Sequence, residues 1–380
     1  MVSSHLSETY FRQRPNCSTT GRIYAGRVMN EAAPRVVAVK KSRITRRLAV
    51  MKNPMLRHEA CAMLILRGHP SIPEVYAYGR TQIFEYLALE MLGETDTSLC
   101  LEEGLTMQNL IALTCQMLDA LAHVHSHHIV HCDVKPDNFL FDLNPAVGQI
   151  KLIDFGISRV YRNPATLEHV QECTMPRHIG SRSYISLNVH NHHNPSRRDD
   201  MESLAYTIVD LLCDGLPWAY REVESRDVSA VKQTWGGSAL CAGYPPVFGA
   251  FVDYVRSLAF QEAPDYATWR RQFLAVAPSI CGDRPLYDES DQGPTVGKHQ
   301  WKNGPASPIG PFRTALVSQK SEREYVTPGT RLWMPMSTWG LPSSVADEDL
   351  IGDEQRTVRE LLDRIDEPPM DEETFENMVE

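Results

Sequence analysis

Two short segments with closely spaced acidic and amide side chains constrain the fold more than any other feature. The first, His131–Asn138, reads HCDVKPDN, and the second, Leu152–Gly156, reads LIDFG and overlaps an apolar run typical of a buried strand. Asp133 is suited to accept a proton, while Asn138 and Asp154 offer the hard oxygen atoms that divalent cations prefer. Their order and spacing indicate one site that combines a carboxylate base with a bound cation.

The same segments match the HxDxxxxN loop and the DFG turn of protein kinases. Phosphoryl transfer needs a group that orients the attacking hydroxyl and accepts its proton, a role that fits Asp133. Asp154 and Asn138 would hold Mg²⁺, and Lys135 can reach the transferred phosphate. We therefore expect ATP and Mg²⁺ as cofactors.

A lysine and a glutamate upstream form a second candidate pair. Lys40 ends the strand-like run VAVK, and Glu59 lies 19 residues on, within a helical pattern over residues 54–67. A lysine on a buried strand is costly unless it is paired, so Glu59 is its natural partner. The alternative is a solvated lysine at a strand end, because Lys41 follows directly.

The glycine-rich loop that covers phosphates in kinases is eroded here. The pattern GxGxxGxV aligns with residues 16–23, NCSTTGRI, and only Gly21 survives of the three glycines. Asn16 and Ser18 replace the other two, and side chains keep a backbone farther from phosphate than glycine does. This segment predicts weak ATP affinity.

Five further stretches resemble the casein kinase I family. Tyr184–Asn188 (YISLN) stands where most kinases have Ala-Pro-Glu, and Ser196–Leu204 (SRRDDMESL) is close to the family's SRRDDLESL. Gly215–Trp218, Leu240–Pro245 and Pro264–Tyr266 are similar to its SLPW, LCKGYP and PDY stretches. Vaccinia-related and tau-tubulin kinases share parts of this pattern, which leaves the subfamily open.

The resemblance covers about residues 10–280 and implies an α+β, bilobal protein kinase fold. It implies a strand-rich N-terminal lobe with one main helix over residues 1–92, and a mainly helical C-terminal lobe over residues 93–282. The Pro-, Gly-, Ser- and charge-rich remainder, residues 283–380, is expected to be an acidic, largely disordered tail.

The resemblance also implies a nucleotide site. Backbone groups of Glu90 and Leu92 in the stretch LEML would bond the adenine, with Leu89 at the gatekeeper position. Asp200 would hold the backbone of the catalytic loop. The catalytic set is Asp133, Lys135, Lys40 and Glu59, and the residues expected around ATP are Gly21, Ile23, Ala38, Lys40, Glu90, Leu92 and Leu140.

Two departures from the family concern regulation and substrate choice. Cys132 replaces the arginine that normally reads a phosphorylated activation loop, so we expect activity without loop phosphorylation. The family's Gly-Thr-Ala-Arg-Tyr, which binds a substrate's existing phosphate, reads Gly-Ser-Arg-Ser-Tyr over residues 180–184. Arg182 and Lys232 remain as a candidate anion site for substrates.

The charge of the chain is unevenly distributed. Residues 341–380 carry a net charge of −11, which leaves +1 for the other 340 residues. An amphipathic pattern over residues 353–366 lies within this segment. One hypothesis is that the tail docks on the basic substrate groove and competes with substrate; the alternative is a solubilising or partner-binding tail.

Composition narrows the cellular setting. The nine cysteines show no CxxC pair, and no long apolar run predicts a membrane span or a secretory signal. We therefore expect a cytoplasmic or nuclear protein that acts on protein substrates, with no nucleic acid and no membrane as partner.

Three function classes compete for this pattern. The first is a serine/threonine kinase acting on acidic or prephosphorylated proteins, which the complete catalytic set favours. The second is a pseudokinase that serves as a binding or scaffold module, which the eroded glycine loop and Cys132 favour. Small-molecule phosphotransferases share the HxDxxxxN logic, but they lack the casein kinase I stretches.

Overall fold

A computed structural model describes residues 22–28, 35–44, 55–81, 83–95, 104–219, 228–280 and 285–297. The described residues form two compact units. The first contains those up to Gly68 together with Ile72–Leu92, and the second contains His69–Ser71 and those from Gly93 onward. The first is a sheet with one helix and the second is mainly helical, as the predicted α+β fold requires. The acidic segment 341–380 lies outside the described residues.

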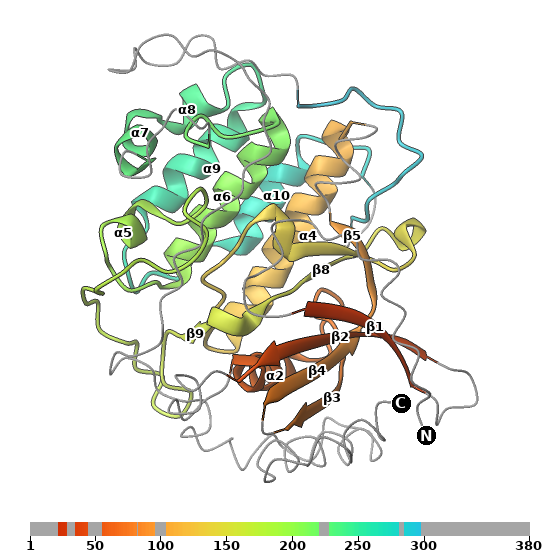
Figure 1. Ribbon diagram of the computed structural model, residues 1–380. Helices are drawn as coiled ribbons and strands as arrows, with labels where there is room; N and C mark the ends of the chain where they lie inside the picture. Colours follow the sequence, from red (N-terminus) through yellow and green to blue (C-terminus); the bar gives the residue numbers. More distant parts are fainter. Residues whose placement is uncertain are drawn as a thin grey trace. The chain divides into compact units, whose positions relative to one another are not determined.

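The first unit is built on an antiparallel sheet with the strand order β1-β2-β4-β3 (Figure 1). Its elements are β1 (Arg22–Val28), β2 (Arg35–Arg43), α2 (Met55–Leu66), β3 (Val75–Arg80) and β4 (Phe84–Glu90). The helix matches the pattern predicted over residues 54–67, and β2 contains the predicted strand that ends at Lys40. Leu56, Ala60 and Leu64 of α2 pack on Tyr78 and Leu87 of the sheet. This apolar contact fixes the helix against β3 and β4.

The alternation of side chains along β2 gives the sheet two different faces. Val37 and Val39 are buried with Tyr86 in a cluster of their own. The residues between and after them, Ala38 and Lys40, therefore point to the opposite face, where α2 packs. The alternation of side chains along β2 thus directs Lys40 toward α2.

The second unit is organised around two long helices, α4 (Met107–Ser126) and α6 (Arg197–Cys213). Helix α6 packs against α4 and α9, and α10 packs against α4. The start of α4 is capped by Thr106, whose hydroxyl accepts the backbone N–H of Asn109. The other helices are α5 (Leu187–His190), α7 (Val228–Thr234), α8 (Gly237–Leu240), α9 (Pro246–Ser257) and α10 (Tyr266–Leu274).

Short strands of this unit frame the motif segments. Strands β5 (Leu92–Thr95), β7 (Phe139–Asp142) and β8 (Ile150–Leu152) form one sheet, and β6 (Ile129–Val130) pairs with β9 (Arg159–Val160). The catalytic loop therefore joins β6 to β7, and the DFG turn joins β8 to β9.

The start of the predicted tail needs a correction, because residues 285–297 pack on the second unit. Asn109 of α4 donates its side-chain amide to the carbonyl of Asp288, and Gln116 donates to the carbonyl of Pro285. Thr106 also donates to the carboxylate of Asp291. The composition of this stretch resembles a linker, but buried polar groups of α4 supply specific partners for its backbone.

None of the helices in the described part of the chain is both long enough and apolar enough to cross a membrane.

Candidate active site

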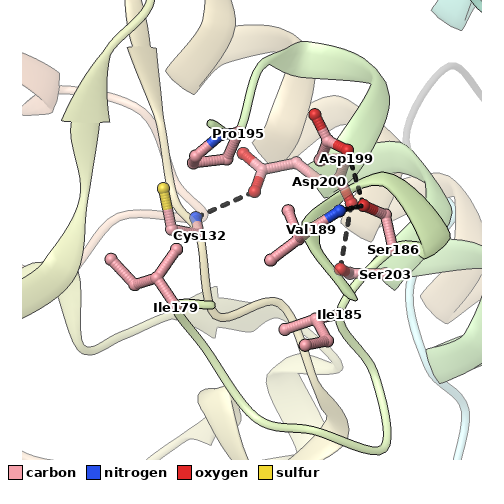
Figure 2. A pocket seen from close by; sticks show the side chains of 9 residues that line it. All are labelled: Cys132, Ile179, Ile185, Ser186, Val189, Pro195, Asp199, Asp200 and Ser203. Carbon is pink, nitrogen blue, oxygen red and sulfur yellow. Dashed lines mark hydrogen bonds between the residues drawn. The ribbon is translucent and has the colours of Figure 1, made fainter. Parts of the chain in front are cut away.

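The catalytic loop is anchored by one carboxylate from the first turn of α6. Asp200 accepts a hydrogen bond from the backbone N–H of His131 at 2.6 Å. It accepts another from the N–H of Cys132 at 2.8 Å (Figure 2). Cys132 has a φ of 68°, a conformation that costs energy for any residue except glycine. The paired bonds to Asp200 hold the loop in this strained shape. The predicted role of Asp200 is confirmed.

A buried histidine completes the anchor. The Nε2 of His125 lies 2.9 Å from Asp200, and its Nδ1 lies 2.5 Å from the hydroxyl of Tyr266. Because a carboxylate only accepts, we assign the ring proton to Nε2. Burial lowers the pKa of His125 below its ordinary value, and the Asp200 carboxylate partly opposes this shift. His125 is therefore part of the scaffold and not a metal ligand.

A small cavity lies between the loop and the start of α6. Cys132, Asp199 and Asp200 line it together with apolar side chains such as Ile179 and Val189 (Figure 2). It has room for about one water molecule, far less than a nucleotide needs. Burial raises the pKa of the Cys132 thiol well above its ordinary value, so this cysteine is held as an unreactive thiol.

Asp133 is held from two sides by groups that can only donate to it. The ammonium of Lys135 lies 2.8 Å from Oδ2, and the backbone N–H of Ser181 donates to Oδ1 at 2.8 Å. Lys135 also donates to the hydroxyl of Ser181 at 2.9 Å. Asp133 and Lys135 thus lie together as the motif predicts, in a triangle that includes the activation segment.

Ser181 is the member of this triangle that the sequence analysis missed. Its position corresponds to the threonine in the casein kinase I stretch Gly-Thr-Ala-Arg-Tyr, which residues 180–184 resemble. The hydroxyl shared by threonine and serine could have indicated a role for Ser181. The neighbouring Gly180 has a φ of 97°, and a Cβ at this position would lie 2.4 Å from the carbonyl oxygen of Cys132. Only glycine allows the segment to pass this close to the catalytic loop.

The two candidate cation ligands are brought together by the backbone. The N–H of Ile153 donates to the carbonyl of Asn138 at 2.9 Å, which places the following residue, Asp154, beside Asn138. The side-chain amide of Asn138 donates to the carbonyl of Asp133 at 2.7 Å, so its Nδ2 end faces the loop. His131 supports the turn by bonding to the Ile153 carbonyl at 3.0 Å.

The donor chemistry of this pair fits a hard divalent cation. Asp154 offers a carboxylate and Asn138 an amide oxygen, and within the described residues no cluster of three or more His, Cys, Asp or Glu side chains could hold a metal alone. Mg²⁺ is commonly bound by one or two protein oxygens together with phosphate oxygens and water. A nucleotide-dependent cation site is therefore the arrangement that these residues suit.

The predicted ion pair of the first unit is present. The ammonium of Lys40 lies 2.7 and 2.9 Å from the two carboxylate oxygens of Glu59. Their side chains are 12% and 2% exposed, so the pair is largely removed from water. The contact links β2 directly to α2.

The residues expected around ATP are placed separately in the two units. Ile23 lies opposite Lys40 in the β1–β2 register, and Ala38 lies opposite Leu89 on β4. Glu90 ends β4, and its N–H donates to the Glu74 carbonyl at 2.9 Å. The other members are Leu92 at the start of β5 and the half-buried Leu140 of β7, while Gly21, Asn16 and Ser18 lie outside the described residues.

The candidate anion site needs a correction at Lys232. This side chain is completely buried, and its ammonium donates to the backbone carbonyls of Ile185 at 2.6 Å and Arg182 at 3.3 Å. Lys232 lies four residues after the buried Val228 and so shares the inner face of α7. Burial lowers its pKa well below the ordinary value. Lys232 therefore supplies no surface cation beside Arg182.

A comparison with known families agrees with this geometry. A family model for the protein kinase domain matches residues 19–239. This span holds the Lys40–Glu59 pair, the catalytic loop and the DFG turn. Protein kinases use ATP and a divalent metal to phosphorylate protein substrates. Because the match covers more than half of its length, the chain belongs to the protein kinase family.

Proposed function

We propose that this chain is a serine/threonine kinase of the casein kinase I type that phosphorylates acidic proteins with Mg²⁺ and ATP. The observation that carries the proposal is the triangle of Asp133, Lys135 and Ser181, in a loop anchored by Asp200. This arrangement supplies a candidate base and a candidate cation for the transferred phosphoryl group.

The chain's own residues have distinct roles in this proposal. Asp133 orients the substrate hydroxyl and accepts its proton, while Lys135 stabilises the charge of the transferred phosphoryl group. Asn138 and Asp154 hold Mg²⁺, which when bound neutralises the phosphates. Lys40, oriented by Glu59, binds the α- and β-phosphates.

The casein kinase I assignment is supported by contacts between the stretches that carry the resemblance. Ser186 of YISLN donates to Asp199 of SRRDDMESL at 2.5 Å, and the N–H of Leu187 donates to Glu202 at 2.8 Å. These bonds tie the end of the activation segment to α6, a role for which this chain has no Ala-Pro-Glu. The residues particular to the family thus act together.

The direct test is phosphotransfer. The purified chain is incubated with labelled ATP, Mg²⁺ and casein, and the labelled amino acid is identified after hydrolysis. We expect phosphoserine or phosphothreonine, and Asp133→Asn or Asp154→Asn to reduce the rate at least a hundredfold. Asp142→Asn, a carboxylate at the end of β7, is the matched control. Equal labelling by the wild type and both active-site variants would refute the proposal.

The pseudokinase remains a second candidate because only one of three glycines is kept in the loop that covers phosphates. The two functions differ in one measurement. A pseudokinase shows a rise in melting temperature with Mg²⁺ and ATP, or no shift, but no transfer to any substrate. A kinase shows both the shift and the transfer, and Asp154→Asn weakens the Mg²⁺-dependent part of the shift.

We further propose that activity does not depend on a phosphate in the activation segment. Glu172 of this segment bonds to Arg198 of α6 at 2.5 Å and lies 3.3 Å from His193. A permanent carboxylate thus ties the segment to α6, and Cys132 offers no guanidinium beside Asp133. Phosphatase treatment should leave the rate unchanged, and a loss of activity with the removed phosphate would contradict this.

A further inference from the structure

The strongest feature outside the reaction centre is the environment of Lys232. Its ammonium donates to the Ile185 and Arg182 carbonyls, and the ring centres of Tyr206 and Trp218 lie 4.6 and 5.3 Å away. A cation gains from the faces of aromatic rings when it is removed from water. The lysine is therefore enclosed by the activation segment and two rings of the second unit.

This environment makes the lysine depend on the position of the segment. Burying an ammonium is costly unless its N–H groups are satisfied. Within the described residues no carboxylate forms an ion pair with Lys232, and the nearby Glu202 is bonded to Tyr206 and to the N–H of Leu187. If the segment moved away, the ammonium would lose both carbonyls. Lys232 thus favours the segment in the observed position.

The clamped carbonyls are directly connected to the catalytic carboxylate. The N–H groups of Tyr184 and Ile185 both donate to the carbonyl of Ser181, at 2.8 and 3.0 Å, and so form a tight turn. One end of this turn is bonded to Asp133 through the N–H of Ser181, and the other end is held by Lys232. The same turn therefore links the position of Asp133 to the position of Lys232.

A second side chain holds the middle of the same turn. The indole N–H of Trp218 donates to the carbonyl of Ser183 at 2.8 Å. Three successive attachments, at Arg182, Ser183 and Ile185, therefore use carbonyl oxygens and not side chains. This pattern fixes the path of the backbone whatever substrate is bound.

We propose that Lys232 is a positioning residue that holds residues 181–185 in register with Asp133, and that it takes no part in binding a substrate phosphate. The inference rests on the proposed kinase function. It means that substrate selection through this position does not require prior phosphorylation of the substrate, because the only charge that α7 supplies here is used inside the protein.

The test compares two acceptor peptides that differ only in a phosphoserine three residues before the target serine. We expect Lys232→Met to lower kcat/KM on the order of tenfold to a hundredfold, and by the same factor for both peptides. Most of the loss should be in kcat. Arg182→Ala is the matched control for a substrate-binding cation, and it should change KM for the phosphorylated peptide alone.

A stronger effect on the phosphorylated peptide would overturn the proposal. If Lys232→Met reduced use of the phosphorylated peptide at least threefold more than use of the plain peptide, Lys232 would be a substrate-binding residue and the proposal would be wrong. Melting temperature checks folding of the variant. If Lys232→Met does not fold, Lys232→Gln carries the same comparison, since its amide retains donors for the carbonyls.

A readout without phosphotransfer separates this inference from the proposed function. Amide hydrogen exchange of residues 181–187 should be at least severalfold faster in Lys232→Met than in the wild type, with α4 unchanged as an internal reference. Absence of catalysis in the wild type would refute the kinase proposal but leave this measurement valid. Unchanged exchange in the segment would overturn the positioning role.

Discussion

Two buried lysines in this kinase are stabilised in different ways. Lys40 in the first unit is paired with the carboxylate of Glu59, whereas Lys232 in the second unit is surrounded by backbone carbonyls and aromatic faces. Lys40 remains 12% exposed, and Lys232 is completely buried. The lysine proposed to bind phosphates stays partly exposed beside a carboxylate partner. A charge that serves the scaffold is enclosed.

The difference also concerns what is left when each lysine is removed. Removing Lys40 leaves a carboxylate that is 2% exposed without its ammonium. Removing Lys232 leaves backbone carbonyls and aromatic rings, and the nearby buried Glu202 keeps its hydrogen bonds from Tyr206 and the N–H of Leu187. The two sites therefore predict different losses of stability for the same substitution.

The largest effect is expected at the ion pair. Lys40→Met should lower the free energy of unfolding by about 3 kcal/mol and abolish phosphotransfer, because Glu59 would lose its ammonium. The double variant Lys40→Met/Glu59→Leu should regain most of the stability but no activity. Denaturant unfolding and the casein assay measure the two quantities.

Lys41→Met is the matched control for this prediction. Its ammonium lies over the rings of Phe84 and Tyr86, on the other face of the sheet. Such a half-exposed contact is worth about 1 kcal/mol or less. A loss of stability in Lys41→Met equal to that in Lys40→Met would show that burial of the pair does not decide the energy.

An intermediate effect is expected at Lys232. Lys232→Met removes two hydrogen bonds, each worth about 1 kcal/mol, but it also removes the cost of burying an ammonium. We expect a net loss of about 1–2 kcal/mol in the free energy of unfolding, smaller than for Lys40→Met. A loss larger than that of Lys40→Met would reverse the comparison.

The stability difference at Lys232 should also depend on pH. Burial lowers the pKa of Lys232 in the folded protein below its ordinary value of 10.5. The unfolded chain therefore binds this proton more strongly than the folded protein does. The cost of burying the charge is fully present below the folded pKa, and it fades as the pH rises from there toward 10.5. The wild type should gain stability relative to Lys232→Met as the pH is raised above neutral. A pH-independent difference would contradict the lowered pKa of Lys232.

The last prediction concerns the pH dependence of stability at a buried acid in the same unit. Burial raises the pKa of Asp199 from 3.8 to about 7, although Ser186 and the N–H of Ser196 donate to its carboxylate. The unfolded chain loses this proton first, so the native state should become less stable as the pH rises from about 4 to 7. Asp199→Asn should show a flatter profile in urea unfolding at several pH values. Parallel profiles would contradict the raised pKa.

The fold and the reaction centre could be predicted for different reasons. The strands around Lys40 and the helix with Glu59 follow from side-chain periodicity, and their pairing follows from the cost of an unpaired buried charge. Asp133, Asn138 and Asp154 lie in two short segments whose spacing is typical of kinases. The neighbouring strands place these three side chains, so contacts with distant parts of the chain are hardly needed to predict the site.

What the sequence alone could not reveal depends on contacts between distant segments. Ser181 gains its role only where the activation segment meets Asp133, 48 residues earlier in the chain. The stretch 285–297 has the composition of a linker, and it is ordered because Asn109 and Gln116 of α4 supply partners for its backbone.

The sequence by itself determined the class of this protein, because the residues of the reaction are grouped in short motifs whose spacing is set by local backbone geometry. The tertiary structure alone decided what Lys232 does. Its spacing from Val228 shows an inner face of α7, but not that the carbonyls of Arg182 and Ile185 and the rings of Tyr206 and Trp218 enclose it there. Whether a lysine binds a substrate phosphate or the protein's own backbone is set by burial, and burial results from packing across the whole unit.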